Sequence, residues 1–203
     1  MILAGGQARR MGGCDKALVE LAGRPLLAHA IARATPQVSR LVINANGDPA
    51  RFDAFGLPVV ADSVTEDDGG SAGPLAGVLA GMEWAAAHAA DCRWIATFPT
   101  DAPFFPADLV PQLADATANE NVMLACAESR GRRHPVFGLW PVDLQADLRR
   151  SLVEDRVRKV ESWTARHGLA CVSFPASVVD PFFNINRPDD VNAAAEIFTK
   201  LNS

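Results

Sequence analysis

The chain has 203 residues, of which 49% are apolar, a composition typical of a folded globular protein with one large hydrophobic core. No linker rich in Pro, Gly or Ser divides it, so we expect a single domain over residues 1–203. The net charge of −5 gives no sequence-wide basic surface. Nucleic acid and anionic membranes are therefore not expected as partners, and any anion site must be local.

The four cysteines show neither CxxC nor Cys/His metal spacing and lie far apart, at Cys14, Cys92, Cys126 and Cys171. This argues against structural zinc or a disulfide framework and favours a cytoplasmic location. The N-terminus does not resemble a signal peptide, and Glu83 interrupts the apolar stretch 74–90. We expect no membrane-spanning segment.

Short apolar runs alternate with amphipathic stretches along the chain. In chain order, strands are predicted at residues 2–3, 40–44, 58–61, 93–98, 121–127, 135–140 and 169–174. Helices are predicted at residues 25–34, 74–89, 106–118, 142–152, 156–166 and 188–201. Four of these helices, those at 25, 74, 106 and 188, open on a proline, the residue that fits the first turn of a helix.

This alternation indicates βαβ units, an α/β fold and a mainly parallel sheet with buried strands. Residues 128–133 join two strand-like runs without room for a helix, so this pair is expected to be antiparallel and the sheet mixed. The acidic, small-residue segment 66–72 is predicted to be a mobile loop.

One loop near the N-terminus combines the end of an apolar strand, paired glycines, arginine and lysine; its key residues are Leu3, Ala4, Gly5, Gly6, Arg10 and Lys16. Glycines let backbone amides approach phosphate oxygens closely, and Arg10 and Lys16 would neutralise phosphate charge. The spacing fits neither G-x-x-x-x-G-K-[ST], since Ala17 follows Lys16, nor G-x-G-x-x-G. The pattern predicts a triphosphate site of a different kind.

Polar residues also follow later strands, and the carboxyl ends of parallel strands share one edge of a sheet. Asp101 is a candidate Mg²⁺ ligand, although an Asp before a proline-containing turn can also serve as a cap. Asp62 could accept hydrogen bonds from guanine N1–H and its exocyclic amine, assisted by Asn44, or could cap its strand. Gly73 and Gly77 open a helix whose N-terminus could approach the ligand, and they could also let a proline-started helix pack closely on the sheet.

Over residues 3–6, 10–12 and 15–16 the glycine loop resembles the signature of nucleotidyltransferases, and specifically of the molybdenum cofactor guanylyltransferases. The resemblance implies a three-layer, Rossmann-like nucleotidyltransferase fold with a mainly parallel, mixed central sheet. Residues 3–6 and 73–77 are similar to the guanylyl type, from which related cytidylyl enzymes differ. The segment 65–72 is longer than the family pattern leads us to expect.

The resemblance also implies roles for individual residues. Arg10, Lys16 and Asp101 would be catalytic, with Asp101 binding Mg²⁺. The nucleotide would be contacted by Leu3, Ala4, Gly5, Gly6, Lys16, Asn44, Asp62, Gly73, Gly77 and Asp101.

Late in the chain, Asn184 and Asn186 resemble the family's Asn-x-Asn motif, which holds metal or acceptor; otherwise an Asn before proline is a cap or turn. His134, before Pro135, resembles a recurrent family pair and is a candidate acceptor contact. The basic groups at 130–134 and 156–159 are either phosphate-docking surfaces or ordinary surface charge.

The implied reaction transfers GMP from GTP to the terminal phosphate of molybdopterin or its molybdenum-loaded form, with Mg²⁺ as cofactor and pyrophosphate as by-product. Proteins of molybdenum insertion and molybdoenzyme maturation would be partners. Two alternatives remain at this point. One is a nucleotidyltransferase that uses CTP or a sugar phosphate, and the other is a non-catalytic nucleotide-binding module.

Overall fold

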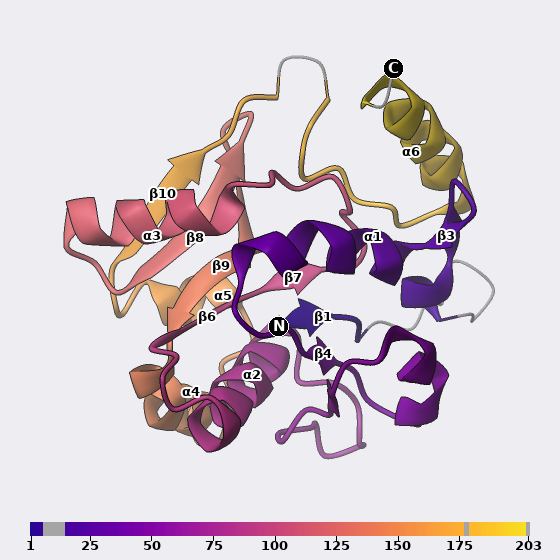
Figure 1. The fold of residues 1–203 in the computed structure, drawn as a ribbon. Coiled ribbons are helices and arrows are strands. Elements are labelled where there is room, and N and C mark those ends of the chain that lie inside the picture. The colour runs from indigo at the N-terminus through magenta and orange to yellow at the C-terminus, as the bar shows by residue number, and fades with distance from the viewer. Residues whose placement is uncertain (6–14, 177–178, 202–203) are drawn as a thin grey trace.

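The computed structural model describes residues 1–5, 15–176 and 179–201 (Figure 1). The strands are β1 (Ile2–Leu3), β2 (Glu20–Leu21), β3 (Arg24–Pro25), β4 (Ile43–Asn44), β5 (Val59–Val60), β6 (Trp94–Ala96), β7 (Phe98–Pro99), β8 (Leu124–Ser129), β9 (Arg132–Pro141) and β10 (Leu169–Ser173). The α-helices are α1 (Leu26–Ala34), α2 (Pro74–His88), α3 (Leu109–Glu120), α4 (Gln145–Val153), α5 (Val160–Thr164) and α6 (Pro188–Leu201). Short 3₁₀ helices are η2 (Lys16–Leu18), η3 (Thr35–Gln37), η4 (Pro49–Phe55) and η5 (Val142–Leu144).

The central sheet is mixed and has two halves. One half has the strand order β5-β4-β1-β7 with parallel pairing throughout. The other has the order β10-β8-β9-β6, in which β9 runs antiparallel to both neighbours while β10 is parallel to β8. The halves meet at Thr97, whose N–H donates to Gly138 O at 3.0 Å, while the next N–H, of Phe98, donates to Met1 O at 3.0 Å. The predicted α/β fold with a mainly parallel, mixed sheet is confirmed.

Successive residues of the strands face opposite helix layers, as the two-residue period of a strand requires. Ala96 and Leu139 pack in a core that includes α1 and α3, whereas their neighbours Ile95 and Trp140 pack in a second core with α2, α4 and α5. Figure 1 shows these helices on the two sides of the sheet. The result is a three-layer arrangement. Among the described residues, no helix has the length and apolar character needed to cross a membrane.

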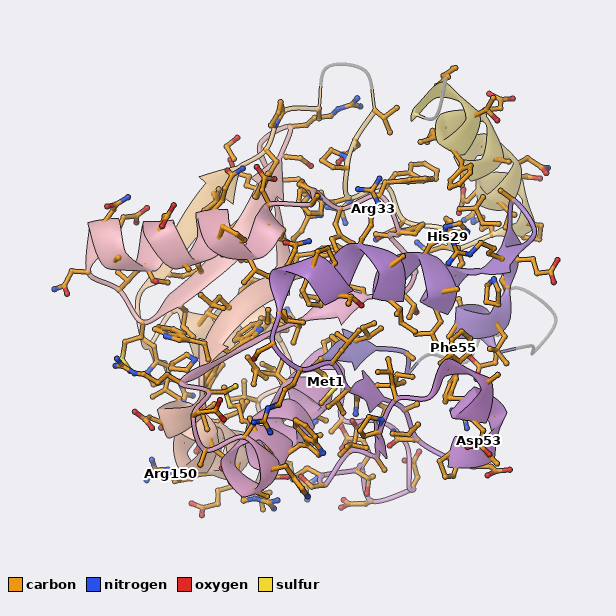
Figure 2. All side chains as sticks on the ribbon, in the orientation of Figure 1. Met1, His29, Arg33, Asp53, Phe55 and Arg150 are labelled. Atoms are coloured by element: carbon orange, nitrogen blue, oxygen red, sulfur yellow. The ribbon has the colours of Figure 1, made fainter. Side chains whose placement is uncertain are left out.

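A smaller third core closes one end of the molecule. Leu21 and Leu26 pack there with Ile185 and with Ala194 of α6. His29 of α1, labelled in Figure 2, is buried at this end; its Nε2 lies 2.8 Å from Leu21 O and its ring packs edge-on against Phe198. This packing brings the segment before α6 against the loop that follows β7, where Ile185 N–H donates to Asp101 O at 2.7 Å.

The hairpin between β8 and β9 confirms the predicted antiparallel pair. Arg130 and Gly131 both have positive φ, of 50° and 72°, the conformation of a two-residue turn whose twist matches paired strands. Glycine adopts it freely and arginine at some cost.

Some predicted elements differ from the structure. The strand expected at 93–98 is divided at Thr97, because its two parts pair with different partners. The helix expected at 156–166 is only α5, since Arg156 has a φ of 51° and Arg158 donates to the carbonyls of Leu152 and Val157. The helix expected from Pro106 begins at Leu109, and Pro25 pairs in β3 before α1 begins.

Candidate active site

A cavity of about 370 Å³ lies at the carboxyl ends of β1, β4, β5 and β7, the place where open α/β sheets bind ligands. The predicted residues that line it are Leu3, Ala4, Gly5, Lys16, Asn44, Asp62, Gly73, Gly77, Asp101 and Asn184. Gly6 and Arg10 lie outside the described residues. The structure thus gathers most of the predicted nucleotide site in one cavity.

At one end of this cavity, Lys16 joins two segments that are far apart in the sequence. Its Nζ donates to Asp101 Oδ2 at 2.8 Å and to Asn186 Oδ1 at 2.6 Å. The Lys16 side chain is only 15% exposed. Asn186 is therefore held beside Asp101, although Asn186 does not line the cavity. In the part of the chain that the structure describes, Asn184 lines the cavity but makes no hydrogen bond to Lys16. The alternating asparagines reach the site from an irregular segment rather than from a strand.

The oxygen atoms around Lys16 Nζ are suited to a hard divalent cation. A carboxylate from Asp101 and an amide oxygen from Asn186 already turn toward one positive charge. Within the described part of the chain no group of three or more His, Cys, Asp or Glu side chains is placed to hold a metal. A set of one carboxylate and amide oxygens fits Mg²⁺, which usually takes its remaining ligands from water and substrate phosphates.

At the other end, the carboxylate of Asp62 is held by two asparagine amides. Asn44 Nδ2 donates to Asp62 Oδ1 at 2.9 Å and to Val60 O at 3.1 Å. Asn46 Nδ2 donates to Asp62 Oδ2 at 2.8 Å. Ser71 adds a longer contact of 3.4 Å to the same oxygen. Because each carboxylate oxygen can accept more than one hydrogen bond, Asp62 keeps acceptor capacity for a ligand.

The start of α2 forms one wall of the cavity. Gly73 precedes the helix with a φ of 87°, a conformation that favours glycine, and Pro74 occupies the first turn. At Gly77 a Cβ would lie 2.5 Å from Asn44 Oδ1 and 2.8 Å from Leu3 Cδ2. Gly77, predicted to let the helix approach the ligand or pack closely on the sheet, lets the helix pack closely against Asn44.

His134 lies at the hairpin end of β9 and does not line the cavity, although Val136 on the same strand does. Its ring stacks on Phe182 with 4.6 Å between centroids, and its Nε2 lies 2.7 Å from Ser129 Oγ. Ser129 donates to Asp180 Oδ1 at 2.8 Å. Burial lowers the pKa of His134.

A Ser/His/Asp grouping was not expected from the sequence, yet Ser129, His134 and Asp180 come together in space. Their order differs from that of a catalytic triad, because the serine proton points to the carboxylate and the imidazole N–H must donate to the serine oxygen. The imidazole therefore cannot take the serine proton in this arrangement.

The acidic segment predicted to be a mobile loop forms ion pairs with the basic group at 156–159. Arg158 pairs with Glu66, with 3.1 Å between Nη2 and Oε2, and Arg156 lies 3.2 Å from Asp67. The hydrogen bond from Arg158 lowers the pKa of Glu66. These two arginines are engaged with the loop, so the hairpin arginines Arg132 and Arg133, both exposed, are the freer basic group.

Asn46, Ser71 and Arg51 were not singled out from the sequence. The Arg51 guanidinium donates to the carbonyl of Asn46 and to the carboxylate of Asp15. Asn46 follows Asn44 by two residues, so the alternation of a strand end was an available signal for it. Arg51 gave no signal, because its contacts depend on how η4 folds back on the loop before it.

Comparison with known proteins identifies the family. A model of the MobA-like NTP transferase domain matches residues 1–169. A molybdenum cofactor guanylyltransferase of Rhodopseudomonas palustris (strain BisB5) is 54% identical over 197 residues, covering 97% of this chain and 92% of the relative. One from Bradyrhizobium sp. (strain ORS 278) is 51% identical, covering 97% and 91%.

Solved structures share the fold at low sequence identity. Molybdopterin-guanine dinucleotide biosynthesis protein A from Archaeoglobus fulgidus has a TM-score of 0.75 at 20% identity, covering 98% of this chain and 97% of that one. The 4-diphosphocytidyl-2C-methyl-D-erythritol synthase of Anaerococcus prevotii has a TM-score of 0.73 at 12% identity, covering 98% and 94%. A Mycobacterium tuberculosis protein in complex with manganese has a TM-score of 0.61 at 15% identity, covering 96% of each chain.

The family match covers most of the chain, and the sequence relatives are more than half identical over nearly their full length. The cavity at the strand ends agrees with that assignment. The chain is a nucleotidyltransferase that belongs to the MobA-like NTP transferase family and, within it, to the molybdenum cofactor guanylyltransferases.

Proposed function

We propose that this enzyme transfers GMP from GTP to the terminal phosphate of molybdopterin, with or without bound molybdenum, and releases pyrophosphate. The observation that carries the proposal is the division of one cavity into two chemically different ends. Asp62 offers hydrogen-bond acceptors at one end, and Lys16, Asp101 and Asn186 gather at the other. A nucleoside triphosphate has the same polarity, with a base at one end and phosphates at the other.

The hydrogen-bond acceptors at the base end of the cavity favour guanine over the other bases. The Asp62 carboxylate can accept from N1–H and from the exocyclic amine of guanine, whereas adenine and cytosine lack this pair of donors. The fold alone does not decide the base, since a diphosphocytidyl enzyme shares it. The high identity to guanylyltransferases supports GTP over CTP.

At the phosphate end the reaction forms a bond between an acceptor phosphate oxygen and the α-phosphorus, and breaks the bond from that phosphorus to the oxygen bridging to the β-phosphate. The acceptor phosphate is largely ionised near neutral pH, with a second pKa of about 6, so it needs no strong general base. Lys16, with Arg10, would bind the triphosphate and balance charge on the departing pyrophosphate. Asp101 and an Asn186 oxygen would hold Mg²⁺, which supplies charge neutralisation when bound.

The acceptor end is proposed from the position of Asn184 and Asn186 beside Asp101, with His134 and the hairpin arginines farther along β9. We further propose that residues 1–203 act as one domain, supported by the sheet that continues through Thr97. Proteins that insert molybdenum or mature molybdoenzymes are the partners we propose for handing over the product, and a reducing cytoplasm stays our prediction for its location.

The experiment uses purified enzyme with GTP and molybdopterin, with Mg²⁺ or with EDTA, and measures pyrophosphate and the dinucleotide by mass spectrometry. We expect both products in equal amounts with Mg²⁺ and neither with EDTA. The Asp101→Ala variant should fold normally, by circular dichroism and thermal unfolding, and form no dinucleotide. Normal turnover by a folded Asp101→Ala enzyme would overturn the assignment of Asp101 as the metal ligand. GTP hydrolysis without dinucleotide would overturn the proposed acceptor.

A further inference from the structure

Asn46 holds the base-end carboxylate by a reciprocal pair of hydrogen bonds. Its Nδ2 donates to Asp62 Oδ2 at 2.8 Å, and its Oδ1 accepts from the backbone N–H of Asp62 at 2.8 Å. Reversing the amide would place oxygen against oxygen and N–H against N–H. The side chain therefore has one orientation, which fixes both the main chain and the carboxylate of Asp62.

The main chain of Asn46 is itself fixed by Arg51, on the 3₁₀ helix η4 whose Asp53 and Phe55 are labelled in Figure 2. Arg51 Nη2 donates to Asn46 O and Nη1 donates to Asp48 O, each at 2.6 Å. The guanidinium also lies over the Phe52 ring, 4.5 Å from its centroid. Two bonds to carbonyls and a stacked ring leave the loop after β4 little freedom.

The same guanidinium reaches the phosphate end. Arg51 Nε donates to Asp15 Oδ2 at 2.6 Å, and the other oxygen of Asp15 accepts from Ala17 N–H at 3.1 Å. Asp15 thus caps η2, the turn that carries Lys16. The scaffold behind Asp62 is therefore continuous with the scaffold behind Lys16.

We propose that Asn46 is a specificity-determining positioning residue: it orients Asp62 so that the free acceptor sites of the carboxylate face the two donors of a guanine. Asn46 acts through Asp62 and does not line the cavity itself. This inference rests on the proposed function, in which Asp62 contacts the base. Without Asn46 the carboxylate keeps one amide partner, Asn44, and can turn about it.

The test measures dissociation constants for GTP and ITP by isothermal titration calorimetry, with Mg²⁺ and without acceptor. ITP keeps N1–H but lacks the exocyclic amine, so the ratio of the two constants reports the second hydrogen bond to Asp62. The proteins are wild type, Asn46→Ala, Asp62→Ala and the double variant. The control is Gln37→Ala, which removes another half-buried amide that bonds backbone atoms of Arg33, Pro106 and Val110 away from the cavity.

We expect wild type and Gln37→Ala to prefer GTP by about tenfold or more, the effect of one hydrogen bond to a charged group. Asp62→Ala should lose this preference and Asn46→Ala most of it. The double variant should bind GTP no more weakly than Asp62→Ala alone, since Asn46 has nothing to orient once the carboxylate is gone.

These measurements distinguish failure of the proposed base contact from failure of the inference about Asn46. A wild-type enzyme that binds both nucleotides equally, or an Asp62→Ala variant that keeps the preference, would overturn the base contact of the proposed function and the inference with it. Loss of preference in Asp62→Ala but not in Asn46→Ala would overturn the inference alone. Equal losses in Gln37→Ala and Asn46→Ala would also overturn it, because the effect would then be one of general stability.

Discussion

Replacing Gly77 by alanine distinguishes the effect of close helix packing on nucleotide binding from its effect on the stability of the fold. The new Cβ would lie 2.5 Å from Asn44 Oδ1 and 2.8 Å from Leu3 Cδ2. These contacts are too short to keep, so the Asn44 side chain must move. Overpacking typically costs about 1–3 kcal/mol, while alanine is favoured over glycine within a helix by about 1 kcal/mol. We expect a net loss of about 1 kcal/mol, which lowers Tm by about 2–4 °C in a chain of this size.

The larger effect should fall on nucleotide binding. A displaced Asn44 gives up its 2.9 Å hydrogen bond to Asp62. Asp62 is then no longer held toward the base, and losing one hydrogen bond from the base to this charged carboxylate, worth about 1.5–3 kcal/mol, should lower GTP affinity by about tenfold or more. Calorimetric titration with GTP and thermal unfolding measure the two effects on the same sample.

Gly81→Ala is the matched control, four residues later in α2. Its Cβ would meet Ile95 Cδ1 at 2.8 Å and Met1 Cε at 3.1 Å, the ends of flexible apolar side chains outside the cavity. We expect a similar small change in Tm and unchanged GTP affinity. If Gly77→Ala binds GTP as tightly as Gly81→Ala does, the argument that Asn44 holds Asp62 for the nucleotide is refuted.

Three further predictions concern other parts of the molecule. Thr97→Val should lower Tm by about 4–8 °C, because the buried Thr97 hydroxyl accepts from Trp140 Nε1 at 2.8 Å and an unpaired buried donor costs about 2 kcal/mol. Thermal unfolding measures this loss, and an equal drop in Tm for Thr97→Ser, which keeps the hydroxyl, would contradict it. Lys16→Met should bind free Mn²⁺ more tightly than wild type in the absence of nucleotide, because the ammonium no longer competes for the oxygens of Asp101 and Asn186. Electron paramagnetic resonance measures this binding, with Lys16→Arg as the charge-retaining control. Unchanged Mn²⁺ binding would contradict the inference that the metal and the ammonium use the same oxygens. His134 should titrate below its ordinary pKa of about 6.5 in an NMR pH series, because burial disfavours its charged form. Its contribution to the free energy of unfolding is then present above pH 6.5 and is lost as the pH falls through the lowered pKa. A pKa raised above 6.5 would contradict this prediction.

Much of the fold could be predicted because the strands and helices carry their own periodicity. The parallel half of the sheet and the hairpin at Arg130 and Gly131 follow from local patterns. The division at Thr97 could not be predicted, since it arises only when one segment pairs with β9 on one side and β1 on the other. The same holds for residues 156–159, where a helical pattern yields to ion pairs with the loop at Glu66 and Asp67.

In the candidate site, too, some residues could be predicted from the sequence and others could not. Lys16, Asn44, Asp62 and Asp101 were predicted because each stands beside a strand end or in a distinctive loop, and the structure gathers them at one cavity. Arg51 could not be found in the sequence because a surface arginine on a short 3₁₀ helix has no distinctive pattern. His134 and Asp180 were not expected near Ser129, because their proximity depends on the return of the chain after β10.

One competition experiment distinguishes guanylyl transfer to molybdopterin from its alternatives. Purified enzyme, Mg²⁺ and molybdopterin are mixed with equal GTP, CTP and ATP, and the dinucleotide formed is identified by mass spectrometry. We predict the guanine dinucleotide alone. A cytosine product would keep the reaction but contradict the role of Asp62 at the base end, and the absence of any dinucleotide, with activity on a sugar phosphate instead, would contradict the acceptor.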